Sequence, residues 1–212
     1  MNIFVVGGLA GLSLLPILPD PFHNQDHVNF WEWTIRGIHG LIYGEQASLA
    51  FFYTKENYNE HWKGLNYNGK TILDIGADVG STALYFTEMG ASKIYAVEGN
   101  PYYYASLESN SSFIGDVTSI NMFVDTKEKL SYLIHNYPVD VMKIDIEGGE
   151  ILLADMDDST LQLIPEYIIE VHNQEIFTIL NRRFMEANYK ISSFVFTNGC
   201  PILIVERKPW AG

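Results

Sequence analysis

The chain has 212 residues, of which 47% are hydrophobic and 18% charged, and its formal net charge is −13. This length and composition indicate one globular domain with an apolar core and exclude a disordered chain. A nucleic-acid binder needs clustered Lys and Arg to offset phosphate charge, and no basic run here is longer than Arg182-Arg183. Nucleic acid is therefore not expected as a partner.

Residues 1–70 have weak periodicity and are predicted to form a mostly helical extension that covers the substrate. Residues 3–18 are almost all apolar, but no Lys or Arg precedes them, and Gly7, Gly8 and Pro16 interrupt them. The run is shorter than the ~20 residues of a membrane helix, so membrane association and export are not favoured. Close-set aromatics follow at Phe30, Trp31, Trp33, Tyr43, Phe51, Phe52 and Tyr53. They suit either the packing of a helical flap or contact with an acceptor.

From residue 71 to 212, short apolar runs alternate with helical stretches. The predicted strands are Thr71–Ile75, Lys93–Val97, Ser119–Val124, Val139–Ile146 and Tyr167–Val171. The predicted helices are 81–89, 101–112, 126–136 and 150–164. Two strand-like runs, Tyr189–Thr197 and Pro201–Arg207, are joined by the hairpin signal Asn198-Gly199. The pattern predicts a parallel α/β sheet, covered on both faces and closed by an antiparallel hairpin.

A glycine-rich turn follows the first predicted strand, in the order Asp74-Ile-Gly76-Ala-Asp78-Val-Gly80. Glycines let the backbone turn tightly and approach a ligand, and the N-terminus of helix 81–89 points free N–H groups at the same place. The spacing D-x-G-x-x-x-G differs from the G-x-G-x-x-G of dinucleotide binders. An acid at the first position would repel a pyrophosphate but suits the cationic methionine end of S-adenosylmethionine, so NAD is disfavoured.

Further cofactor contacts are predicted after the second and third strands. Glu98 ends the second strand, where a carboxylate can accept both hydroxyls of a ribose. Asn100 is expected to cap the next helix and is placed with the cofactor-binding residues. Asp125, at the end of the third strand, is the candidate for the adenine amine. Tyr102 or Tyr103 would stack on the ring or lie on the helix surface.

The fourth predicted strand delivers Asp145 and Glu147 to the carboxyl edge of the sheet, where Asp145 would also reach the cofactor. Lys143, inside this strand, needs a carboxylate partner, for which Asp74 on the adjacent first strand is the candidate. A structural ion pair with no catalytic part is the alternative interpretation of Lys143.

The fifth predicted strand ends Glu170-Val-His172-Asn173. His172 is the first candidate for the base that removes a proton from a hydroxyl nucleophile, with Asp145 and Glu147 as the other catalytic candidates. An unperturbed imidazole titrates near ~6.5, and a hydrogen-bonded structural histidine is the alternative. The oxygens of Asp145, Glu170 and Asn173 suit Mg²⁺, but no metal ligands are assigned and a divalent metal is not favoured.

The segments TILDIGADVGSTALYF, YAVEGNP, VMKIDIEGGE and IIEVH resemble the FkbM family of S-adenosylmethionine-dependent methyltransferases. The resemblance covers residues 71–173 and implies a Rossmann-like class I methyltransferase sheet of seven strands, in the order 3-2-1-4-5-7-6 with the last strand antiparallel. It also implies S-adenosylmethionine as cofactor and O-methylation of a sugar, glycolipid or other small molecule. Asp78 stands where this family usually has Asn, and Glu98-Gly99 replaces the usual Glu-Pro.

Two other functions remain open at this level. One is a non-catalytic S-adenosylmethionine-binding protein of the same fold, although such a protein would not need the acids and histidine after the fourth and fifth strands. The other is an N- or RNA-methyltransferase, but the [DNS]-P-P-[YFW] motif of amino-group methylation is missing after the fourth strand. The single cysteine, Cys200, allows no intrachain disulfide, fits the cytoplasm and is interpreted as a buried, inert thiol.

Overall fold

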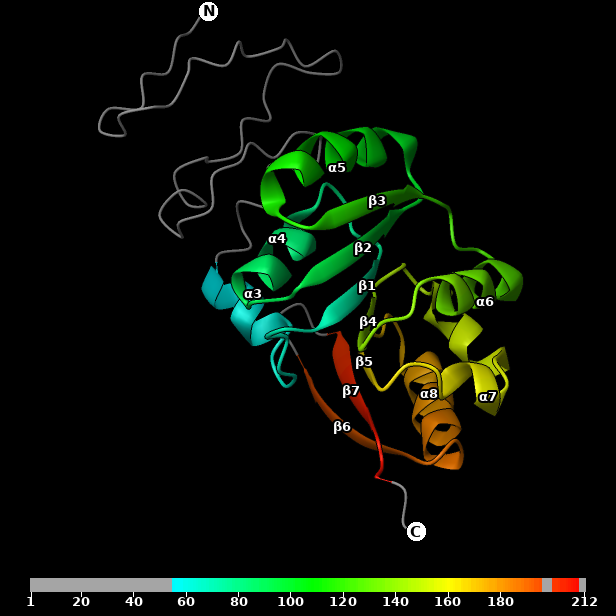
Figure 1. The fold of residues 1–212 in the computed structure, drawn as a ribbon. Coiled ribbons are helices and arrows are strands. Elements are labelled where there is room, and N and C mark those ends of the chain that lie inside the picture. Colours follow the sequence, from blue (N-terminus) through cyan, green and yellow to red (C-terminus); the bar gives the residue numbers. More distant parts are fainter. Residues whose placement is uncertain (1–54, 196–199, 210–212) are drawn as a thin grey trace, which may run out of the picture.

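The computed structural model describes residues 55–195 and 200–209 (Figure 1). Most of the predicted extension, including the apolar run at 3–18 and the seven aromatics, lies outside the described residues, as does the Asn198-Gly199 turn. In the part of the chain that is described, no helix is both long and apolar enough to cross a membrane.

The elements alternate along the chain as the periodicity predicts. The first are α3 (Lys55–His61), β1 (Thr71–Ile75), α4 (Ser81–Glu88), β2 (Lys93–Glu98), α5 (Pro101–Ile114) and β3 (Val117–Asn121). Next come α6 (Lys127–Asn136), β4 (Val141–Ile144), the 3-10 helix η1 (Gly149–Asp155), α7 (Asp158–Leu161) and β5 (Glu166–Glu170). The last are α8 (Gln174–Glu186), β6 (Tyr189–Val195) and β7 (Pro201–Arg207).

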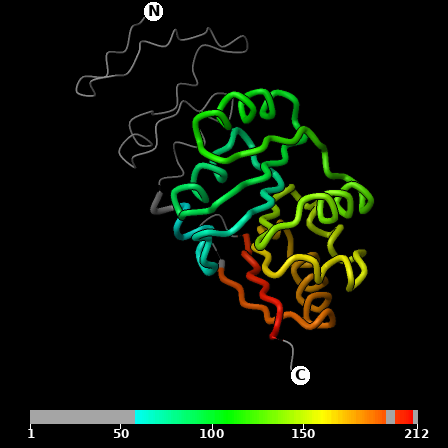
Figure 2. Tube along the Cα trace, in the orientation of Figure 1, coloured from blue at the N-terminus to red at the C-terminus, as the bar shows by residue number. Residues whose placement is uncertain are grey.

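The seven strands form one sheet in the order β3-β2-β1-β4-β5-β7-β6, which confirms the predicted topology. Neighbouring strands are parallel except at β7, which is antiparallel to both β5 and β6. The chain builds one half of the sheet outward from β1 and then returns to build the other half from β4 (Figure 2). The strand order therefore reverses between β1 and β4, and open α/β sheets bind ligands at the carboxyl ends of the strands at such a point.

Helices cover both faces of the sheet and enclose two apolar cores (Figure 1). The core under α3, α4 and α5 contains Trp62 and Phe86, and the core under α6, α7 and α8 contains Leu130 and Phe184. Burying side chains of this size is worth roughly 1.5–3 kcal/mol each, so these two layers supply most of the driving force for the fold. Trp62 belongs to this core although it precedes residue 71, where the core domain was predicted to begin.

The predicted helix 150–164 is wrong, because two short helices occupy this segment. Met156 is extended, with φ −70° and ψ 143°, and ends η1. The Asp157 side chain then accepts the N–H of Thr160 and begins α7. An Asp that caps its own new turn competes with a continuous helix, and the periodic apolar pattern did not reveal this.

Other elements also differ from the predictions; for example, β4 runs from 141 to 144 instead of 139 to 146. Helix α8 was not predicted, although Ile176, Leu180 and Phe184 form a buried stripe at four-residue spacing. Strand β3 runs from 117 to 121 instead of 119 to 124, so Asp125 lies four residues beyond the strand that was expected to carry it.

Candidate active site

The turn between β1 and α4 bends at glycines whose backbone conformation side chains rarely adopt. Gly76 has a φ of +77° and Gly80 a φ of +98°. A Cβ at Gly76 would lie 1.8 Å from the carbonyl oxygen of Asp145, so no side chain fits there. Gly80 precedes the first turn of α4, whose unpaired N–H groups make this end of the helix suited to an anionic group such as a carboxylate.

The predicted pair of Lys143 and Asp74 is confirmed, and it lies inside the protein. Lys143 Nζ is 3.0 Å from Asp74 Oδ1, and both side chains have 0% exposure. Asp74 Oδ2 also accepts the Thr82 hydroxyl at 2.5 Å, and Lys143 donates to the carbonyl of Gly76 at 2.6 Å. Burial lowers the pKa of Lys143, but Asp74 and Asp145 outweigh it and hold the pKa above its usual value. Asp74 therefore stabilises the glycine turn through Lys143 and Thr82, and its buried side chain presents no free surface to a ligand.

Glu98 and Asp78 face one another across this turn. Glu98 Oε2 accepts the Asp78 N–H at 2.9 Å, and Oε1 accepts the Asn100 N–H at 2.7 Å. Each carboxylate oxygen has a second lone pair, so Glu98 retains acceptor capacity for a ligand hydroxyl. Burial and the charge of Glu98 raise the pKa of Asp78 to about 7. Asp78 Oδ1 is buried and has no hydrogen-bond partner among the described residues.

Gly99, the residue after Glu98, lies close to the segment that follows β3. A Cβ on Gly99 would lie 2.6 Å from Phe123 Cα and from Phe123 Cδ2, so the ring of Phe123 lies directly against this glycine. Phe123 is 65% exposed, the largest exposed fraction among the large hydrophobic side chains of the described residues. Sequence reasoning missed this aromatic, because its partner, Gly99, follows a different strand of the sheet.

Three other residues that were considered as cofactor contacts are Asn100, Tyr102 and Asp125. Asn100 caps α5 by accepting the Tyr102 N–H at 2.9 Å, and the Tyr102 side chain is 58% exposed. Asp125 lies on the surface, 2.6 Å from Lys129 Nζ, and a hydrogen bond from Lys129 lowers the pKa of this carboxyl. Asp125 is therefore already paired, whereas Phe123 presents an open ring face.

The carboxyl ends of β4 and β5 bring together the predicted catalytic residues. Asp145 Oδ1 lies 3.6 Å and Glu147 Oε2 3.5 Å from His172 Nε2. Glu150, which sequence analysis did not single out, lies on the other side of the ring, with Oε1 2.8 Å from Nδ1. Glu150 has 0% exposure and also accepts the N–H groups of Ile146 and Gly148.

These neighbours change the proton affinity of the ring. The Glu150 hydrogen bond and the surrounding carboxylates raise the pKa of His172 to about 9. Burial raises the pKa of Asp145 to about 6, although Lys143 and His172 act against it. The pKa of His172 thus lies above the ~6.5 of an unperturbed imidazole. At neutral pH His172 is an imidazolium between carboxylates, and a proton acceptor must be sought beside it.

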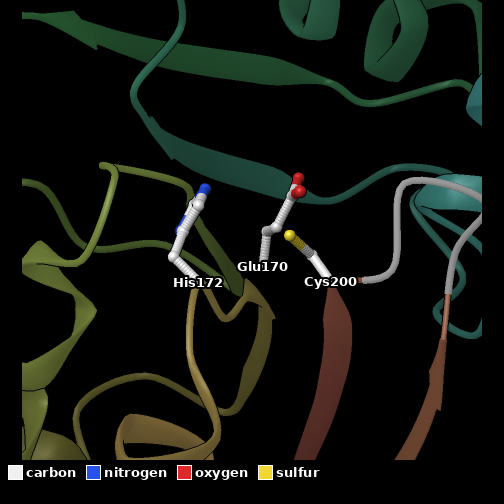
Figure 3. A group of neighbouring side chains, drawn as sticks. All are labelled: Glu170, His172 and Cys200. Atoms are coloured by element: carbon white, nitrogen blue, oxygen red, sulfur yellow. The ribbon is translucent and has the colours of Figure 1, made fainter.

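A second buried histidine lies at the same edge. His61, at the end of α3, places Nε2 2.7 Å from Glu170 Oε2, and its ring stacks on Trp62 with centroids 4.2 Å apart. Cys200 immediately precedes β7 and lies beside Glu170 (Figure 3). Cys200 is half-buried, which corrects the interpretation of a buried thiol. No local pattern links His61 to Glu170, which are 109 residues apart in the sequence.

The oxygens of Asp145, Glu170 and Asn173, which were considered for Mg²⁺, do not all face one position. Asn173 Oδ1 accepts the Ile176 N–H at 2.9 Å and caps α8, so this oxygen points into the helix. The groups of His, Cys, Asp and Glu that do converge among the described residues are Glu170, His172 and Cys200, and Asp145, Glu150 and His172.

Several solved structures that match this fold are methyltransferases. Fibrillarin from Aeropyrum pernix, with natively bound S-adenosyl-L-methionine, matches with TM-score 0.53 and 15% identity over 66% of this chain and 68% of that one. Precorrin-6y C5,15-methyltransferase from Geobacter metallireducens matches with TM-score 0.55 and 16% identity, over 66% and 81% of the two chains. The ribosomal protein L11 methylase of Lactobacillus delbrueckii matches with TM-score 0.51 and 17% identity, over 67% and 72%. The described chain therefore has the class I methyltransferase fold.

Sequence comparison is less specific. No family model matches the chain, so the resemblance to the FkbM family is not shown. Uncharacterized protein 158B of Sulfolobus islandicus rod-shaped virus 1 is 34% identical over 111 residues, which are 51% of this chain. The matched segment covers 65% of that viral protein, less than two thirds of its length.

Proposed function

We propose that the protein binds S-adenosylmethionine and transfers its methyl group to a hydroxyl of a small molecule or sugar. The observation that carries the proposal is the Glu98 carboxylate, which faces a glycine turn at the reversal point of a class I methyltransferase sheet and has acceptor positions to spare. When bound, S-adenosylmethionine supplies an electrophilic methyl group on a sulfonium.

The residues of the turn suit the two ends of this cofactor. Glu98 would accept the ribose hydroxyls, and the unsatisfied Oδ1 of Asp78 would accept from the ammonium of the methionine end. The N–H groups at the start of α4 would hold its carboxylate. The exposed ring of Phe123, against Gly99, would form one wall of the adenine site in place of Tyr102 or Tyr103.

The acceptor would lie between the ends of β4 and β5. Asp145, whose side chain is 27% exposed, would take the hydroxyl proton as the new carbon–oxygen bond forms, and His172 would hold that carboxylate in place. Four carboxylates surround this position, on Asp145, Glu147, Glu150 and Glu170. They would repel a polyanion, so an uncharged hydroxyl compound is favoured over RNA.

Calorimetric titration tests the donor site. The protein should bind S-adenosylmethionine and S-adenosylhomocysteine but not NAD. Glu98→Ala should weaken donor binding by roughly tenfold to a hundredfold, because each hydrogen bond to a charged group is worth ~1.5–3 kcal/mol. Glu108→Ala, on the exposed face of α5, is the matched control and should bind normally. NAD binding without S-adenosylmethionine binding would refute the donor assignment.

Turnover tests the acceptor site. Purified protein with labelled donor should methylate members of a panel of sugars, glycolipids and small hydroxyl compounds. Asp145→Asn should lower turnover by ~10²–10⁴-fold, with a smaller loss of donor affinity than Glu98→Ala causes. Full turnover in Asp145→Asn would rule out this carboxylate as the proton acceptor.

A further inference from the structure

The antiparallel pairing of β5 and β7 brings three different metal-binding side chains to one place. Glu170 is the last residue of β5 and His172 lies two residues beyond it, and both side chains point to the same side of the chain (Figure 3). The ladder pairs Glu170 with Ile202, and Val171 donates its N–H to the carbonyl of Pro201 at 2.9 Å. Continued by two residues, this register sets Cys200 opposite His172. Figure 3 shows the three side chains converging at this edge of the sheet.

The donor atoms are close enough to share one ion. A carboxylate oxygen of Glu170, a ring nitrogen of His172 and Sγ of Cys200 all lie within 4.8 Å of one another. Thiolate, imidazole and carboxylate together are a ligand set for Zn²⁺, whereas Mg²⁺ prefers oxygen alone. Three protein ligands leave the fourth tetrahedral position open, which is the arrangement of catalytic zinc sites.

Neighbouring groups orient two of the three side chains as metal sites require. Ligating histidines almost always hold their second ring nitrogen against a carboxylate or carbonyl, and His172 Nδ1 lies 2.8 Å from the buried Glu150. This contact leaves Nε2 for an ion. Glu170 is oriented in turn by His61, whose Nε2 lies 2.7 Å from Glu170 Oε2.

The local charge also favours a dication. Asp145, Glu147 and Glu150 all lie within 3.6 Å of the His172 ring, and Glu170 adds a fourth carboxylate at the same edge. Lys143 faces them from the core, but it pairs more closely with Asp74, at 3.0 Å, than with Asp145, at 3.8 Å, so one lysine is shared between two carboxylates. A bound Zn²⁺ would neutralise this excess of negative charge and displace the thiol proton of Cys200 and the proton on Nε2 to solvent. In the metal-bound protein the ion would then replace the contact of Nε2 with Asp145.

We propose that Glu170, His172 and Cys200 form a zinc site with one open coordination position beside Asp145. The site goes beyond the proposed methyl transfer, and its role there rests on that function: an acceptor hydroxyl at the open position would lose its proton to Asp145 more readily, because zinc lowers the pKa of a bound oxygen. Metal binding itself requires neither donor nor acceptor, so the two proposals can fail separately.

Cobalt substitution tests the site directly. The full-length protein, freed of metal with a chelator, should bind one Co²⁺ at this site with a thiolate-to-cobalt charge-transfer absorption, and Zn²⁺ should abolish that absorption by competition. Because Cys200 is the only cysteine of the chain, the absorption reports this site alone. A folded wild-type protein that shows no such absorption would overturn the proposal without any variant.

Variants test which residues ligate the ion. Cys200→Ser should lose the absorption, and Glu170→Gln and His172→Gln should each weaken Co²⁺ binding. Glu150→Gln should weaken it by ~10–100-fold through the orientation of His172. His135→Gln, an exposed histidine on α6, is the matched control and should bind normally. Thermal unfolding confirms that each variant is folded, and unchanged binding in both folded Glu170→Gln and folded His172→Gln would also overturn the proposal.

Discussion

Replacing Asp78 by Asn tests whether the glycine turn stores an unfavourable charge. Asp78 is half-buried, its Oδ1 lacks a hydrogen-bond partner among the described residues, and it faces Glu98. Asn keeps the size of the side chain and is one of the residues that best tolerate the φ of 52° at this position. The substitution therefore removes the charge and little else.

The magnitude follows from the pKa. Burial and Glu98 raise the pKa of Asp78 from 3.8 to about 7 in the folded protein. Between these two values the folded state holds a proton that the unfolded state has lost, so the stability of the wild type falls as pH rises through this window and is constant above it. At ~1.4 kcal/mol per unit, the penalty at pH 8 is about 4 kcal/mol at most, and partial contact with water reduces it to roughly 2–4 kcal/mol.

Urea unfolding at several pH values measures this effect. Asp78→Asn should raise the free energy of unfolding at pH 8 by the amount above and by only about 1–2 kcal/mol at pH 5, where most of the penalty has not yet developed. Asp157→Asn is the opposite control, because hydrogen bonds from Ser159 and Thr160 lower the pKa of Asp157 to about 2, and its loss should reduce stability at pH 8. A pH-independent difference for Asp78→Asn would refute the reasoning.

Two further predictions concern the support of the turn, and both are measured by urea or thermal unfolding. Lys143→Met leaves the Asp74 carboxylate buried without its partner and should cost ~3–5 kcal/mol, whereas Lys129→Met, at an exposed pair, should change stability little. Equal effects of the two would contradict a buried role for Lys143. Gly76→Ala brings a Cβ within 1.8 Å of a backbone oxygen and should prevent stable folding, but Gly69→Ala, at a similar φ of +73° with nothing within 4 Å, should cost only ~1–2 kcal/mol. A Gly76→Ala protein as stable as Gly69→Ala would show that the turn adapts without cost.

Much of the sheet could be predicted because its determinants are local. Apolar runs of strand length, separated by helical periodicity and closed by a hairpin signal, indicate the order of the elements. The glycine turn, Glu98 at a strand end and a lysine that required a buried carboxylate were readable for the same reason. Each depends on a few neighbouring residues or on the parallel register of adjacent strands.

The surroundings of the site depend on contacts between distant segments, and these are decided by packing. His172 becomes a cation because Glu150 folds back against its ring through a 3-10 turn that replaced the predicted helix. His61 meets Glu170 only because α3 packs on the sheet, and Cys200 meets His172 only through the register of the last hairpin. Charge, burial and metal-binding geometry at this edge arise from such pairings, since the interaction of two groups depends on their distance in space and on the solvent between them. The sequence by itself therefore determined the elements and the edge of the sheet where a ligand would bind, and the tertiary structure alone decided which side chains face one another there.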